Sequence, residues 1–188
     1  KGNQKHVDVP QYYNGEKVVG IKDVQISDKK GVFEGNNLYS VNMGENCVSI
    51  GKRAFYNCKN LEKVYFSEQT TFIGRNAFFG CTSLLELNLP DTVTNVGYLA
   101  FYDTGWYLNA IEELNKNVKF DETVCLYAGD ILLDVLYVVD GAINNVKDGT
   151  RVIAEWALGR ISDKKFPVTK IVIPSSVKFI NSFNLGVD

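Results

Sequence analysis

The sequence of 188 residues contains only one histidine, one methionine and two tryptophans. Catalysis by a Ser–His–Asp or Cys–His arrangement needs a base beside the nucleophile. The single histidine, His6, lies near the start of the chain, so these catalytic classes are nearly excluded. No group of side chains has the spacing of a metal site, and no glycine-rich phosphate loop is present. We therefore expect no cofactor and no enzyme of these classes.

Long apolar runs and a strong charge of either sign are also missing. No run approaches the roughly 18 apolar residues of a membrane span, which argues against membrane insertion. The net charge of −2 gives no reason to expect nucleic acid or an anionic membrane as a partner. The chain opens at Lys1 without a signal peptide and ends soon after Ile180 begins another repeat, so we expect a fragment of a longer chain.

What the sequence does contain is a repeat of 23 residues. The pattern Ile-Gly-x-x-Ala-Phe-x-x-Cys-x-x-Leu at residues 50–61 recurs at residues 73–84, and Val96 opens a third copy. Self-similarity at such a period is typical of a solenoid, in which each copy is one coil. Alternation around Val64 and Leu87 predicts strands with one buried face, and equivalent strands should pair in parallel. The segment around Ala77 and Phe78 could form one helical turn, so we predict an α/β repeat solenoid of short parallel strands and short helical turns.

The remaining segments divide the chain into four parts. Residues 1–20 are expected to form an N-terminal capping hairpin, with residues 7–9 and 16–19 flanking an Asn-Gly turn. Residues 21–104 form the repeat coils. Residues 105–148 interrupt them with a helix near 109–116 and a hairpin turning at Gly129, packed on the solenoid to cover their apolar side chains. Residues 149–188 return to the repeat and are cut short at the C-terminus.

The repeat resembles the BspA-like leucine-rich repeat family. The resemblance depends on the motif given above and on Leu-Pro-Asp-Thr-Val-x-x-Val at Leu89, which recurs as Ile-Pro-Ser-Ser-Val-x-x-Ile at Ile173. It implies a secreted or surface-attached protein, often bacterial, that contacts other proteins or host surfaces. It implies no shared catalytic residues. The chain departs from the family at Thr104, Leu158 and Asn184, where Cys, Phe and Ala would be usual.

Four cysteines are too few and too regularly placed to predict a disulfide framework. Cys58 and Cys81 share one repeat position, and Cys47 occupies another. We favour reduced thiols that fill the core. Stacked coils could bring Cys58 and Cys81 within disulfide range, so a bridge between them stays open.

One acidic row is the only candidate for chemistry. Glu45, Glu68 and Asp91 are 23 residues apart in turn and should stack on neighbouring coils. Such carboxylates could bind Ca²⁺ or serve glycoside hydrolysis. Polar residues are also simply favoured in solvated turns, and Ser175 takes the same position later. We prefer the turn interpretation.

The outward, concave face of the long strands is the candidate binding surface. Equivalent positions form two rows of side chains that differ from coil to coil, as expected if they recognise a shaped partner. The two rows are Ser40, Lys63, Glu86 and Lys170, and Asn42, Tyr65, Asn88 and Val172.

Three functions are compatible with these observations. The first is a non-catalytic extracellular or cell-surface module that binds a protein or glycan, for example in adhesion to host or matrix surfaces. The second is a carbohydrate-active enzyme on a solenoid, which needs a cleft with paired carboxylates. The third is a structural spacer in a longer surface protein, which needs no binding patch. The sequence does not indicate the oligomeric state.

Overall fold

A computed structural model describes residues 5–23, 30–117, 123–137, 142–143, 146–159 and 170–182. The chain forms two compact units, residues 1–111 and 112–188, and each is described by itself. No helix among the described residues is long and apolar enough to cross a membrane.

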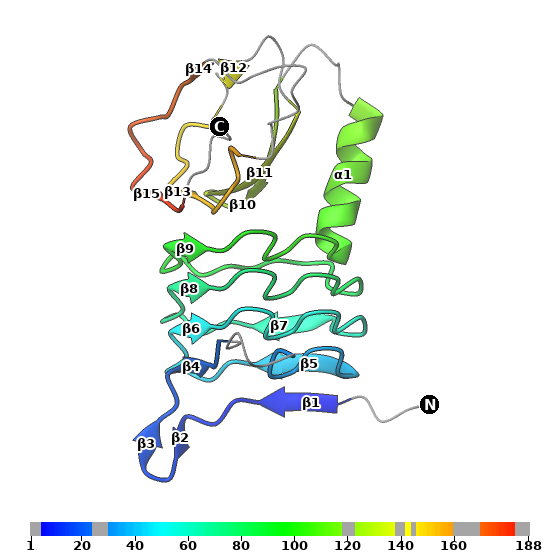
Figure 1. Ribbon diagram of the computed structural model, residues 1–188, viewed down its shortest axis with the longest axis vertical. Coiled ribbons are helices and arrows are strands. Elements are labelled where there is room, and N and C mark those ends of the chain that lie inside the picture. Colours follow the sequence, from blue (N-terminus) through cyan, green and yellow to red (C-terminus); the bar gives the residue numbers. More distant parts are fainter. Residues whose placement is uncertain are drawn as a thin grey trace. The chain divides into compact units, whose positions relative to one another are not determined.

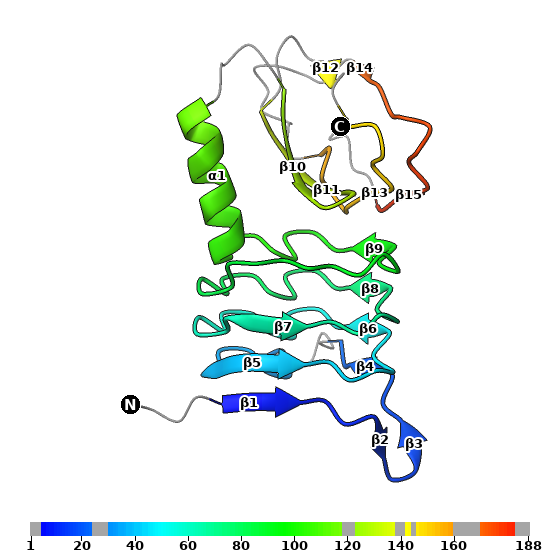
Figure 2. The same cartoon turned by 180° about the vertical axis from the view of Figure 1, so that it is seen from behind.

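The first unit consists of stacked coils joined by two parallel sheets (Figures 1 and 2). One sheet has the order β1-β5-β7, and the other has the order β4-β6-β8-β9. Both confirm that equivalent strands of successive coils pair in parallel. The strands of this unit are β1 (Lys5–Asp8), β2 (Tyr12–Tyr13), β3 (Glu16–Lys17), β4 (Gly20–Ile21), β5 (Leu38–Asn42), β6 (Ser49–Ile50), β7 (Lys63–Tyr65), β8 (Phe72–Ile73) and β9 (Asn95–Val96).

Aromatic rings at one repeat position build the core of these coils. Phe78 is fully buried, and its ring stacks on Phe55 at 5.1 Å and on Phe101 at 5.5 Å between ring centroids. Phe33 adds another ring on the other side of Phe55. Coils come this close because glycine precedes the turn in each copy. A Cβ atom at Gly74 would lie 2.6 Å from the backbone nitrogen of Lys52, closer than such contacts allow.

The segment expected to form a helical turn has a different backbone. Asn76 has φ 55° and Gly80 has φ 72°, values of the left-handed region that interrupt a right-handed helix. Every second amide instead donates to the next coil, as Phe55 does to Ala77 and Asn57 to Phe79. The amides between them close short turns within the coil. The expectation of helical turns in the repeat was wrong, because hydrogen bonding between coils replaces helical hydrogen bonding.

The N-terminal segment also differs from its expected pairing. The Asn14-Gly15 turn exists, with positive φ at both residues, and joins β2 to β3. Residues 7–9 do not belong to this hairpin, however. Strand β1 pairs in parallel with β5, with Val7 opposite Val41. Residues 7–9 therefore occupy the place of a repeat strand and cover the open edge of β5.

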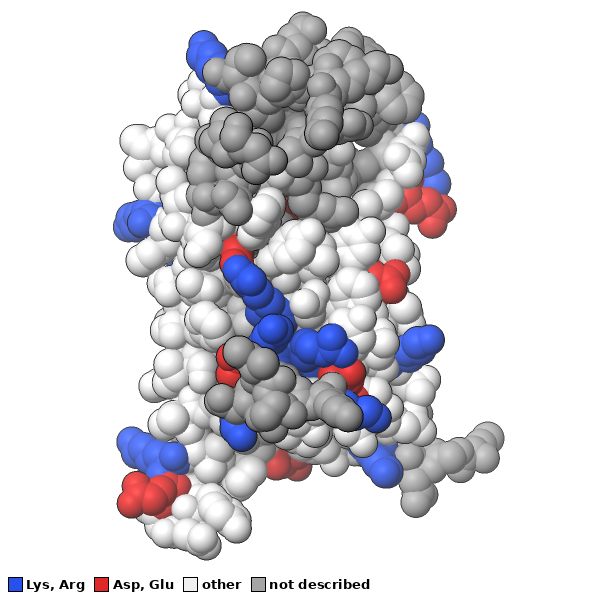
Figure 3. All heavy atoms as spheres, in the orientation of Figure 1, with Lys and Arg blue, Asp and Glu red and all other residues white. Residues whose placement is uncertain are grey.

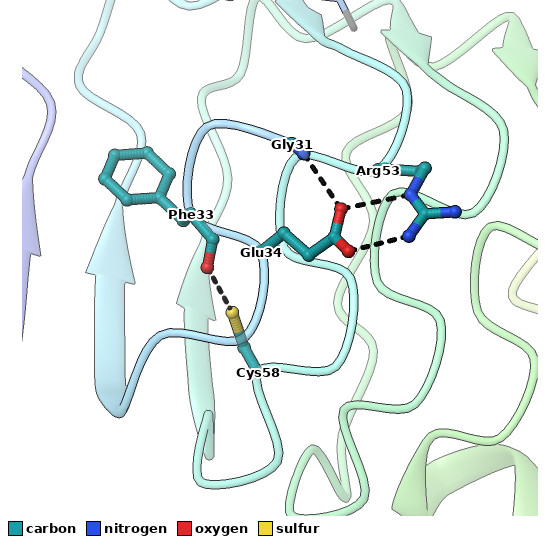
Figure 4. A network of polar contacts seen from close by, with 5 residues as sticks. All are labelled: Gly31, Phe33, Glu34, Arg53 and Cys58. Carbon is teal, nitrogen blue, oxygen red and sulfur yellow. Dashed lines mark hydrogen bonds and ion pairs between the residues drawn. The ribbon is translucent and has the colours of Figure 1, made fainter. Parts of the chain in front are cut away.

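The first coil is held to the second by a polar cluster (Figure 4). The Glu34 carboxylate accepts from Arg53 Nε at 3.0 Å and Arg53 Nη2 at 2.6 Å, and also from the Gly31 amide at 2.9 Å. The guanidinium lies 4.0 Å from the centroid of the Tyr56 ring. These contacts hold the pKa of Glu34 below its ordinary value, chiefly through the hydrogen bonds from Arg53.

Helix α1 (Gly105–Asn117) begins directly after the third copy. Thr104 Oγ1 accepts from the Tyr107 amide at 3.1 Å and donates to the Phe101 carbonyl at 2.8 Å. Thr104 is thus the N-cap of α1, which explains why threonine stands where the repeat has cysteine. The helix starts four residues before the expected residue 109. Tyr107 is the buried large side chain among its described residues, whereas Leu108 is 45% exposed.

The second unit contains the expected hairpin and a return of the repeat. Gly129 and Asp130 join β10 to β11, and β11 pairs in parallel with β13, which pairs with β15. Trp156 has φ 62°, like Arg53 at the equivalent position, and Leu158 is buried where Phe55 is. The strands of this unit are β10 (Val124–Ala128), β11 (Ile131–Tyr137), β12 (Ala142–Ile143), β13 (Val152–Ile153), β14 (Lys170–Ile171) and β15 (Phe179–Ile180).

Candidate functional site

The sheet β1-β5-β7, whose strands are drawn in Figure 2, brings four of the eight expected binding residues together on one face. Ser40 lies opposite Lys63, and Asn42 lies opposite Tyr65. Strand β1 extends both rows by one residue, because His6 pairs with Ser40 and Asp8 with Asn42. We call this surface the outward sheet face, and its residues are His6, Asp8, Ser40, Asn42, Lys63 and Tyr65.

Glu86 and Asn88 do not extend these rows as strand residues. Both are exposed, but residues 85–89 form no strand, so the strand expected around Leu87 is wrong. The Trp106 amide donates to the Leu84 carbonyl at 2.7 Å, and the Gly105 amide donates to the Cys81 carbonyl. The start of α1 therefore holds the backbone at Leu84, two residues before Glu86.

Lys170 and Val172 belong to another sheet. Lys170 lies in β14, which pairs in parallel with β12 in the second unit. Val172 follows that strand and is 42% exposed. The expected rows across all the long strands are thus wrong for these two residues.

Ser40 is not an open binding residue. Its side chain forms a hydrogen bond of 2.6 Å with His6 Nδ1, and the residue is only 8% exposed. The His6 ring also meets Tyr39 edge to face, with 5.4 Å between centroids. This contact corrects the expectation that Ser40 is presented to a partner, because β1 brings His6 over it.

Sequence reasoning missed His6 and Asp8, although the signal was present. The segment Val7-Asp8-Val9-Pro10 matches Leu87-Asn88-Leu89-Pro90 in the repeat. Reading it as a partial copy would have placed it beside β5. The Asn-Gly turn that follows instead favoured a local hairpin. His6 and Ser40 are 34 positions apart in the sequence, which makes their pairing hard to predict.

The Ser40–His6 contact has the separation of a nucleophile and its base. A catalytic triad also needs a residue that orients the imidazole. His6 makes no second hydrogen bond with any other residue in the described part of the chain. The pair therefore links β1 to β5, and the described residues do not complete a triad around it.

The other row of the outward sheet face presents open polar groups. The Asn42 side-chain oxygen accepts from the Gly44 amide at 3.1 Å, and the residue is exposed, so its side-chain NH₂ group has no hydrogen-bond partner among the described residues. The Asp8 carboxylate makes no hydrogen bond or ion pair with another described residue. Tyr65 is 57% exposed, and no described aromatic ring stacks on it. A donor, an acceptor and an aromatic ring are thus available side by side.

The acidic row lies in exposed turns. Glu45, Glu68 and Asp91 are all exposed, and each lies within the hydrogen-bonded turn of its coil. No group of three or more His, Cys, Asp or Glu side chains among the described residues could hold a metal ion. This geometry agrees with the turn interpretation.

All four cysteines are free thiols. Cys58 donates to the Phe33 carbonyl at 2.9 Å, and Cys81 donates to the Phe55 carbonyl at 3.1 Å. Burial raises the pKa of Cys58 to about 11 and raises that of Cys81 further. Cys58 and Cys81 fill the core and form hydrogen bonds with the neighbouring coil. Their raised pKa makes them poor nucleophiles.

Charges of both signs lie on the face drawn in Figure 3, and most of its described surface carries neither. Lys and Arg gather in a short stripe with Asp and Glu beside them, which is not the broad basic surface of a nucleic-acid-binding protein.

Stacked coils with parallel strands at a 23-residue period define a leucine-rich repeat protein. A model of the BspA type leucine rich repeat region, in six copies, matches residues 19–125, and the chain belongs to this family. No curated protein sequence matches the chain. A solved structure of a leucine-rich repeat protein from Bacteroides ovatus ATCC 8483 is similar, with 19% identity and a TM-score of 0.47 over 92% of this chain. The match covers 34% of that protein, so this chain spans about a third of its length.

Proposed function

We propose that this chain is a non-catalytic interaction module that binds a protein or glycan through the outward sheet face. One observation carries the proposal: Asn42 and Tyr65 lie side by side, exposed, on paired strands. Strands fix the positions of such side chains at little entropic cost, and exposed tyrosine is enriched where proteins bind partners.

The proposed location is the surface of a bacterial cell or the medium around it, in adhesion to host or matrix surfaces. The resemblance to BspA-like proteins supports this location. The proposed module needs no cofactor and binds no nucleic acid. A carbohydrate-active enzyme is less well supported, because Glu45, Glu68 and Asp91 stand in exposed turns. A structural spacer is also less well supported, because a spacer has no use for an exposed tyrosine in a polar row.

An array of glycans and host-matrix proteins, probed with the whole chain, tests the proposal. We expect at least one class to bind and Tyr65→Ala to weaken that binding. Tyr13→Ala is the matched control, because Tyr13 is 69% exposed in the β2–β3 hairpin, outside the outward sheet face. An array without any bound component, or binding that Tyr65→Ala leaves unchanged, would contradict this function.

A further inference from the structure

We propose that the row Asp8, Asn42 and Tyr65 is a subsite for a pyranose ring of a neutral glycan. This inference rests on the proposed function, because it assumes that the outward sheet face is the binding surface. It goes further by choosing glycan over protein and by assigning a role to each of the three side chains.

The aromatic member of the row is Tyr65. The residue is 57% exposed, and no other described aromatic ring stacks on it. The axial C–H groups of a pyranose form a weakly polar, electron-poor surface, and the face of an aromatic ring is electron-rich. A sugar can therefore stack on Tyr65 and keep its hydroxyl groups free around the edge of the contact.

The polar members of the row are a hydrogen-bond donor, Asn42, and a hydrogen-bond acceptor, Asp8, on neighbouring strands. Asn42 uses its oxygen for the Gly44 amide, so its NH₂ group is the part available to a ligand. The Asp8 carboxylate is an acceptor with no described partner to compete for it. Adjacent hydroxyl groups of a sugar both donate and accept, and a carboxylate next to an amide NH₂ satisfies such a pair.

Strand register places these groups at a useful spacing. Asp8 is paired with Asn42, and Asn42 with Tyr65, on three neighbouring strands. Neighbouring strands lie about 4.8 Å apart, so the row spans roughly 10 Å. That span is comparable with one or two linked pyranose rings. Because the strands are held by the coils beneath them, the three side chains need little rearrangement on binding.

The charge of the row favours a neutral sugar. Its only charged member is the Asp8 carboxylate, which would repel an acidic sugar bound next to it. The cation on the outward sheet face, Lys63, lies in the other row, two residues before Tyr65 and about 7 Å along the strand. In that row His6 is engaged with Ser40 and does not add an open donor on Nδ1.

Affinity electrophoresis of the whole chain through gels that contain soluble polysaccharide tests the inference. Neutral polymers of glucose, mannose and galactose are compared with an acidic polygalacturonate, and matrix proteins are tested in parallel by surface plasmon resonance. We expect at least one neutral polymer to retard the chain. Tyr65→Ala should weaken this binding about tenfold, the loss expected when one contacting ring is removed. Tyr65→Phe should retain it, whereas Asp8→Asn and Asn42→Ala should weaken it several-fold.

Tyr13→Ala is again the control and should bind like the unmodified chain, and circular dichroism verifies that each variant folds. Retardation by polygalacturonate alone, or by a neutral polymer with no effect of Tyr65→Ala, would overturn the inference. Matrix-protein binding that depends on Tyr65, without any glycan binding, would overturn the inference and leave the proposed function standing. Absence of both kinds of binding would overturn both.

Discussion

At the scale of the residue, Phe78 is the clearest contributor to stability. It is fully buried, stacked between Phe55 and Phe101, and contacts the edge of Phe66 at 5.8 Å between centroids. We expect Phe78→Ala to lower the free energy of unfolding by about 3–5 kcal/mol, because it leaves a cavity between coils. Urea denaturation followed by circular dichroism measures this change. Phe72→Ala, at a 40% exposed position, is the control. A loss below about 1 kcal/mol for Phe78→Ala would contradict the stack.

At the scale of the element, the cap at Thr104 determines where α1 begins. Its hydroxyl accepts from the Tyr107 amide in a site with no solvent exposure. Thr104→Val keeps the volume and removes the hydroxyl, so we expect a loss of about 0.5–2 kcal/mol in the free energy of unfolding. Thr104→Ser should retain most of the stability in the same urea titrations. Equal stability of the Val and Ser variants would show that the cap contributes nothing.

The link between the first two coils should depend on pH. The pKa of Glu34 is lowered from its ordinary value of 4.5, chiefly by the hydrogen bonds from Arg53. Because the pKa of Glu34 is lower in the folded chain than in the unfolded chain, its ionised carboxylate stabilises the fold. This contribution to the free energy of unfolding is complete above the unfolded pKa and is lost as pH falls through the folded pKa. We expect unmodified chain to exceed Glu34→Gln in stability at pH 7, with the difference shrinking below about pH 4.5.

Thermal melts of both chains between pH 7 and pH 3 measure this difference. Glu68→Gln is the control, since Glu68 lies in an exposed turn and forms no ion pair with an arginine in the described part of the chain. A stability difference for Glu34→Gln that stays constant down to pH 3 would rule out a role for its ionisation.

At the scale of the whole molecule, the acidic row makes a prediction about metal ions. Glu45, Glu68 and Asp91 are exposed, and solvent screens charges in such turns. A bound divalent ion would stabilise the fold by mass action. We expect thermal melts with EDTA and with millimolar Ca²⁺ to agree within experimental scatter. A rise of several degrees in Ca²⁺ that Glu68→Gln abolishes would instead establish a cation site.

Much of the fold could be predicted because, in a repeat protein, residues at equivalent positions of successive copies contact one another. The 23-residue period alone identifies Phe55 and Phe78 as core neighbours and Asn42 and Tyr65 as strand neighbours, since each coil packs on the next one along the chain. The backbone of the turns could not be predicted, because the left-handed φ of Asn76 is stabilised by hydrogen bonds to another coil. The local backbone propensities of these residues do not depend on those bonds and therefore could not predict them.

The candidate site was only partly accessible to sequence reasoning. Repeat spacing determined the positions of Asn42, Lys63 and Tyr65 on one sheet face. The tertiary structure decided that β1 joins this sheet, since its pairing joins residues 34 positions apart and the Asn-Gly turn that follows β1 suggests a local partner instead. That pairing covers Ser40 with His6 and places Asp8 beside Asn42. The sequence by itself thus determined the contacts between regular copies of the repeat, and the structure decided the contacts where the copies are irregular, because those depend on residues distant in the chain.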